Sequence, residues 1–115
     1  SLLAEPRFRT AEGNIFEHLG SAPEARYDVI LIDVDHSPNE LLDARNSAFY
    51  TPEGLRQARE HVADDGVLAV WSSAENEIFA RALEEVFSEV RVETVRWRND
   101  LIDEDQHDDL FLARR

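Results

Sequence analysis

The chain has 115 residues, enough for one domain with a single core, and its 43% hydrophobic content is typical of a globular protein. Its 25 acidic residues against 12 basic ones give a formal net charge of −13, which argues against nucleic acid as a partner and favours a cationic small molecule. Cysteine and lysine are absent, which excludes a disulfide framework, a thiolate metal site, a cysteine nucleophile and any catalytic or phosphate-binding lysine.

No stretch of the sequence points to a membrane or to secretion. The apolar runs fall short of the ~20 residues that a membrane-spanning helix needs. The first residues lack the charged start and apolar segment of a signal peptide. We therefore expect a cytoplasmic protein that does not contact a membrane. Methionine is also absent, and we interpret the chain as a portion of a longer protein.

The first half of the chain predicts two strands and a short helix. Residues 8–12 (FRTAE) predict a strand that ends at a Gly-Asn pair, and residues 15–20 predict a helix with one apolar face. Tyr27–Ile32 (YDVILI) is almost entirely apolar, which is typical of a strand buried on both faces of a parallel sheet. The loop that follows is expected to contain one helical turn, over residues 40–45.

The second half begins with a clear helix signal at residues 51–53 (TPE). Thr can cap the helix, Pro fits its first turn, and Glu favours the positive end of the helix dipole. This helix is expected to end at residues 64–66 (DDG), where Gly66 is free to take a positive φ. Residues 67–71 (VLAVW) predict another buried strand, and an unbroken apolar stripe predicts a helix over residues 78–87.

Residues 90–97 and 109–113 predict two further strands, which the acidic loop 99–108 joins as an antiparallel hairpin. Strands and helices thus alternate over a single α/β domain, residues 1–115. The pattern predicts a Rossmann-like, mostly parallel sheet with helices on both faces and a C-terminal antiparallel hairpin. Ligands bind such sheets at the carboxyl ends of the strands. The polar segments expected there are Gly13-Asn14, residues 33–37 and Ser72-Ser73.

Several of these segments together resemble the polyamine aminopropyltransferases, or spermidine synthases. The resemblance covers roughly residues 7–115 and matches the carboxyl-terminal half of a class I S-adenosylmethionine-dependent methyltransferase-type fold, without the first two strands of the full fold. The segments that carry it are Gly13-Asn14-Ile15, residues 27–38 (YDVILIDVDHSP), Phe49-Tyr50 and residues 64–68 (DDGVL).

The resemblance implies aminopropyl transfer from decarboxylated S-adenosylmethionine to a diamine, with no metal ion. In the family, an Asp at the end of a strand removes a proton from the amine, which then attacks the carbon beside the sulfonium. Asp33 matches this catalytic Asp. The family's second Asp falls on His36, or on Asp35 if the alignment shifts by one residue.

The same resemblance assigns Gly13, Asn14 and Ile15 to the binding of the adenine ring, where Asn14 would accept a hydrogen bond through its carbonyl oxygen. The family's Gly-rich loop and its ribose-binding acid have no counterpart in this sequence. We therefore expect S-adenosylmethionine, or its decarboxylated form, to bind weakly or not at all. The missing strands would leave a sheet edge exposed, and we expect a homo-oligomer, a dimer, to cover it.

Other functions stay open at this point. One is a different S-adenosylmethionine-dependent methyltransferase-like protein, and another is a non-catalytic domain of the same fold. The spacing of Asp33 and Asp35 also resembles the first motif of haloacid-dehalogenase-like phosphatases, but the absence of lysine argues against that family. A metal site formed by Asp33, Asp35, His36 and residues 106–109 fits by ligand type, although no spacing joins the two segments.

Overall fold

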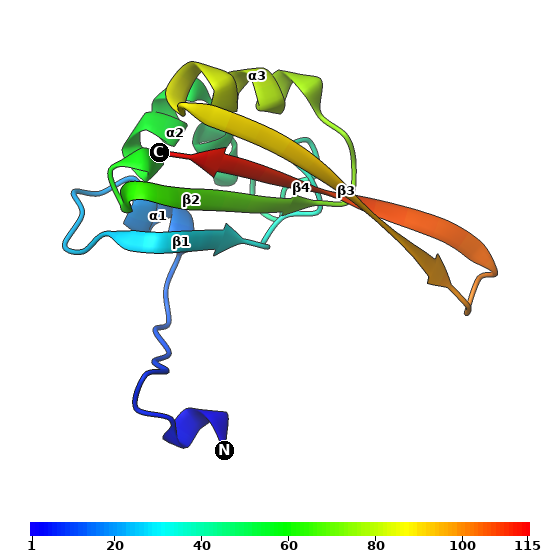
Figure 1. Cartoon of the computed structure of the whole chain (residues 1–115), viewed down its shortest axis with the longest axis horizontal. Helices are drawn as coiled ribbons and strands as arrows, with labels where there is room; N and C mark the ends of the chain where they lie inside the picture. Colours follow the sequence, from blue (N-terminus) through cyan, green and yellow to red (C-terminus); the bar gives the residue numbers. More distant parts are fainter.

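The computed structural model describes residues 1–115 as a four-stranded mixed sheet with helices packed against it (Figure 1). The strands are β1 (Tyr27–Ile32), β2 (Val62–Ser72), β3 (Glu89–Asn99) and β4 (Glu104–Arg114). The helices are α1 (Ile15–Leu19), α2 (Pro52–Arg59), α3 (Glu77–Val86) and the 3-10 helices η1 (Leu2–Ala4) and η2 (Ala44–Tyr50). None of the helices is long and apolar enough to cross a membrane.

The strand order is β1-β2-β4-β3, and only β1 and β2 pair in parallel. β4 lies between β2 and β3 and is antiparallel to both. The predicted Rossmann-like, mostly parallel sheet is therefore wrong, because two of the three strand pairings are antiparallel. The reason is composition: residues 110–113 (LFLA) of β4 are apolar on both sides of the strand and suit a central position. β3 carries charged side chains throughout and tolerates an edge.

One face of the sheet forms the core with the helices. Leu68 pairs with Ala113 and Val70 with Phe111, so these four side chains share a face, and all are buried. The buried helical side chains of the same cluster are Leu19, Phe49, Leu55, Ala58, Phe79, Ala82 and Leu83.

The opposite face is open to solvent along β1. Ile30 and Ile32 point into the core and are 9% and 2% exposed, whereas Val29 and Leu31 are 66% and 60% exposed. The predictions that β1 is buried on both faces and that helices cover both faces of the sheet are therefore wrong. The apolar run of β1 could not reveal this, because it does not show which of its residues face the core. Among the residues of β1, only Ile30 and Ile32 belong to the core.

The strand predicted over residues 8–12 does not form. This segment makes no strand pairing, and Figure 1 shows the N-terminal segment leading away from the sheet. The helix predicted next is confirmed as α1, which begins after Asn14. The Asn14 side-chain oxygen accepts hydrogen bonds from the backbone N–H groups of Phe16 and Glu17, at 2.9 and 3.4 Å.

The predicted start of α2 is confirmed, since Thr51 Oγ1 accepts from the N–H of Gly54 at 3.2 Å and Pro52 is the first helical residue. The helix ends earlier than predicted, at Arg59, because β2 already begins at Val62. The predicted positive φ at Gly66 is also wrong: Asp65 takes it, with φ of 61°.

The remaining helix and the hairpin are confirmed. α3 is capped by Asn76, whose side chain accepts from the N–H of Phe79 at 2.8 Å. The β3–β4 ladder runs from Glu89↔Arg114 to Asn99↔Glu104. Both strands are longer than predicted, so the turn shrinks to residues 100–103, and the end of the hairpin projects from the body of the molecule (Figure 1).

Candidate functional site

The carboxyl ends of the parallel pair, β1 and β2, meet as the sequence indicates. The carbonyl oxygen of His36 accepts from the backbone N–H of Ser73 at 2.7 Å and from its hydroxyl at 2.8 Å. The backbone N–H of His36 donates to the carbonyl of Glu40 at 3.2 Å, which turns the loop back on itself. These bonds tie the segment after β1 to the end of β2.

Asp35 is a buried structural carboxylate, only 6% exposed. Its Oδ1 accepts from the backbone N–H of Leu42 at 2.7 Å and from the amide of Asn46 at 3.0 Å. Its Oδ2 accepts from the hydroxyl of Tyr50 at 2.8 Å. Both oxygens are therefore engaged in fixing the loop and η2, and Asp35 is not placed to receive a substrate.

Tyr50 shows the effect of this environment. Burial raises the pKa of the Tyr50 hydroxyl far above its ordinary value, and the hydrogen bond to Asp35 raises it further. The hydroxyl is therefore protonated at physiological pH and acts as a donor to Asp35. Tyr50 also packs against Phe49 and Phe79, with ring centroids 5.0 and 5.2 Å away, which anchors η2 in the core.

Asp33 and His36 differ from Asp35. Both residues are exposed, and neither side chain makes a hydrogen bond or an ion pair within the chain. Of the three residues predicted to act in catalysis, only Asp33 and His36 thus present free side chains to solvent.

The three residues predicted to bind adenine line a groove of about 520 Å³ beside the free edge of β1. Most of the groove wall is apolar. Gly13 faces open space, because a Cβ built there would meet no atom within 4 Å. The groove is lined by residues 11–15, by His18 and Leu19 of α1, and by Tyr27, Val29 and Ile30 of β1.

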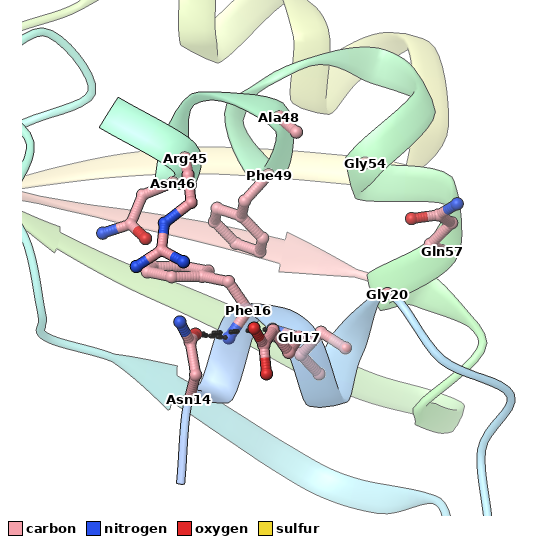
Figure 2. Close-up of a pocket in the computed structure, with 11 residues that line it drawn as sticks. Asn14, Phe16, Glu17, Gly20, Arg45, Asn46, Ala48, Phe49, Gly54 and Gln57 are labelled. Carbon is pink, nitrogen blue, oxygen red and sulfur yellow. Dashed lines mark hydrogen bonds between the residues drawn. The ribbon is translucent and has the colours of Figure 1, made fainter. Parts of the chain in front are cut away.

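Asn14 does not offer the free acceptor that the sequence suggested. Its Oδ1 already accepts two backbone N–H groups of α1, whereas its Nδ2 makes no hydrogen bond within the chain. Figure 2 shows the Asn14 oxygen turned toward the start of α1. In Figure 2 the Asn14 amide nitrogen extends toward Arg45 and Asn46, on the side of the smaller pocket described next.

A smaller pocket of about 140 Å³ lies between α1, η2 and α2, and Asn14 lines this pocket too (Figure 2). Phe16 closes one side, with its ring 4.9 Å from that of Phe49. Arg45 projects from η2 into the space above Phe16 and Glu17 (Figure 2).

The start of η2 carries a testable ion pair. Hydrogen bonds from the side chain and then from the backbone N–H of Arg45 lower the pKa of Asp43 to about 2. The folded-state pKa is depressed, so the stabilising effect of Asp43 is present above its unfolded pKa of ~3.9 and is lost as the pH falls through about 2.

In the variant Arg45→Gln we expect the pKa of Asp43 to rise toward 3.8, measured by NMR titration of the side-chain carboxyl carbon. Titration of Asp43 near 3.8 in the unmodified protein would contradict the pair.

No group of three or more His, Asp or Glu side chains is placed to hold a metal ion. The metal site considered from Asp33, Asp35, His36 and residues 106–109 is therefore not assembled. Asn46 was not singled out from the sequence, although it completes the Asp35 network. No local signal marks Asn46, since its partner lies 11 residues away.

Comparison with known proteins gives no assignment: no family model matches the chain, and no curated protein matches it. The case for a function rests on the groove and the free carboxylate of Asp33. Along β1, Ile30 of the groove and Asp33 are three residues apart, or roughly 10 Å at the usual rise of an extended chain.

Proposed function

We propose that this domain serves aminopropyl transfer from decarboxylated S-adenosylmethionine to a diamine. The observation that carries the proposal is the apolar groove that Gly13, Asn14 and Ile15 share with β1, from which the strand leads to the free carboxylate of Asp33. The proposed reaction is cytoplasmic.

The groove is suited to the nucleoside. Ile15, Val29 and Ile30 offer an apolar wall to the adenine ring. The groove volume of about 520 Å³ falls within the usual range for small-ligand sites. The ribose and the sulfonium would then extend along β1 toward Asp33, over a span of roughly 10 Å, which brings the methylene carbon beside the sulfur to the diamine.

Asp33 is suited to receive the diamine. A carboxylate attracts an alkylammonium and, within about 3 Å, can remove its proton. The freed nitrogen lone pair attacks the methylene carbon next to the sulfonium, the C–N bond forms and the C–S bond breaks. The sulfur leaves as a neutral thioether and the proton stays on Asp33. His36, which is also exposed and unpaired, is the nearest second group in sequence for the far end of the diamine.

NMR titration tests the binding of the nucleoside, because it detects the weak affinity expected of a chain without the Gly-rich loop. We expect decarboxylated S-adenosylmethionine to shift the backbone amide signals of Gly13, Asn14 and Ile15, with a Kd on the order of 1 mM. Gly13→Val should weaken binding at least about tenfold without loss of fold, because Gly13 lines the groove and a Cβ there meets no protein atom within 4 Å. Gly20→Ala, outside the groove, is the matched control. Shifts with intact S-adenosylmethionine alone would favour methyl transfer instead, and no shift with either would overturn the proposal.

The amine step is tested separately. With the nucleoside bound, putrescine should shift the signals around Asp33 in the unmodified protein, and the variant Asp33→Asn should abolish this second response while leaving the first unchanged. Asp100→Asn removes the same charge at the hairpin turn and should change neither response. If putrescine binds equally to the Asp33 and Asp100 variants, it is attracted by the overall negative charge of the protein and not by Asp33.

A further inference from the structure

The two edges of the sheet are protected to very different degrees. β3, at one edge, carries charged side chains along its whole length: Glu89, Arg91, Glu93, Arg96 and Arg98. β1, at the other edge, has a single charged residue, Asp28, followed by four aliphatic residues. Charged side chains on edge strands discourage pairing with other chains, and β1 lacks them over residues 29–32.

The side chains of β1 also favour contact. Tyr27, Val29 and Leu31 are 48%, 66% and 60% exposed and lie on the uncovered face. Their neighbours there are Val67 and Ala69 of β2, which pair with Val29 and Leu31. β1 therefore combines an unpaired backbone edge with a strip of exposed apolar side chains.

We propose that β1 pairs with β1 of a second copy of this chain, antiparallel and across a two-fold axis, to form a continuous eight-stranded sheet. The inference does not rest on the proposed function, although a partner strand at this edge would compete with a ligand, because Tyr27, Val29 and Ile30 also line the groove. A two-fold axis perpendicular to the sheet keeps the core face of each copy on the same side, so residues that oppose one another must share a face. A register in which Ile30 lies opposite the partner's Ile30 meets this condition.

The charges of β1 agree with this register. Val29 lies opposite the partner's Leu31, and Asp28 lies opposite the partner's Ile32. The partner's Asp33 lies opposite Tyr27 and one residue from Arg26, which is the cation at the start of β1. No carboxylate opposes another carboxylate, and the acidic end of each strand meets the end that carries Arg26. A register shifted by one residue in either direction would exchange the faces, and one of the two shifts would also place Asp28 opposite the partner's Asp33.

Net charge opposes the same association. Each copy carries a formal charge of −13, so the two copies repel each other at long range. We therefore expect a weak dimer, with a Kd on the order of 10 µM, that tightens as salt rises from about 0.05 M to about 0.5 M and the Debye length shortens. The expected salt dependence is the reverse of that for a dimer held by ion pairs.

Analytical ultracentrifugation of two double variants tests the interface and its register. Val29→Lys with Leu31→Lys places like charges opposite one another twice, and should raise the dimer Kd at least about tenfold. Val29→Lys with Leu31→Glu makes the surface equally polar but places opposite charges across the axis, and should return the Kd to within about threefold of the unmodified value. Both positions are exposed, so the folded monomer should keep its far-ultraviolet circular dichroism spectrum.

Each other outcome overturns the proposal. A monomer at all concentrations up to about 1 mM, far above the expected Kd, means that β1 binds no second copy. A dimer that is unaffected by either variant uses another surface, such as the projecting hairpin. Loss of the dimer in both double variants points to packing between uncovered sheet faces, which depends on apolar character and not on register. All these measurements are made without ligand, so their failure leaves the nucleoside titration unaffected.

Discussion

Replacing Asp35 with alanine is expected to lower the free energy of unfolding by about 3 kcal/mol or more. The change removes an acceptor that is only 6% exposed and leaves three donors without it: the Leu42 N–H, the Asn46 amide and the Tyr50 hydroxyl. A buried donor without a partner costs about 1–3 kcal/mol, and bonds to a charged group are the stronger ones. Urea denaturation followed by circular dichroism measures the effect.

Asp33→Ala is the matched control, because it removes a carboxylate two residues away that makes no bond within the chain. We expect a change in unfolding free energy within about 0.5 kcal/mol. The loss of unfolding free energy in Asp35→Asn should fall between those of the two alanine variants. The asparagine oxygen can still accept from two donors, and the Tyr50 hydroxyl can turn to accept from the new amide. If Asp33→Ala costs as much as Asp35→Ala, the division of the pair into a free and a structural carboxylate is wrong.

This division could not be predicted from the sequence. Asp33 and Asp35 both follow an apolar strand, and the local pattern treats them alike. What separates them is a set of donors 7, 11 and 15 residues further along, which reach Asp35 only after η2 folds back over the loop. The sequence indicated that the segment after β1 would lie near Ser73, because that follows from the parallel pairing of β1 and β2.

The elements that were predicted well depend on neighbouring residues only. Thr51 caps α2 as predicted, and the predicted apolar stripe of α3 packs into the core. The position of β4 depends instead on a comparison between distant segments. The apolar residues of β4 are consecutive, at 110–113, whereas those of β3 are separated by charged ones, so β4 takes the inner place beside β2, which turns the sheet from mostly parallel to mostly antiparallel.

Residues 8–12 show that a strand-like composition is not sufficient to form a strand. Their composition is compatible with a strand, but a strand also needs a partner to receive its backbone hydrogen bonds. β1 pairs only with β2 and its other edge is unpaired, yet residues 8–12 do not occupy that edge. Instead residues 11–13 line the groove beside it, which is how Gly13 comes to face open space.

Gly54→Ala is expected to destabilise the protein by about 3 kcal/mol, although helix propensity predicts the opposite sign. Gly54 lies in the first turn of α2, where alanine normally gains up to about 1 kcal/mol over glycine. Here a Cβ would collide with the carbonyl oxygen of Ala48, and would lie 2.8 Å from the Ala48 carbonyl carbon and 2.9 Å from the Cα of Phe49. These are backbone atoms of η2, so the whole helix must move.

Movement of η2 would reach the Asp35 network, because η2 also carries Asn46 and Tyr50. Gly54→Ala should therefore shift the NMR signals of the loop at residues 33–42 as well as lower the urea midpoint. Gly13→Ala makes the same chemical change where no atom lies within 4 Å, and its unfolding free energy should stay within about 0.5 kcal/mol of the unmodified value. Equal stability of the two alanine variants would mean that η2 separates from α2 at little cost. Asp35 would then not hold the loop as tightly as its hydrogen bonds suggest.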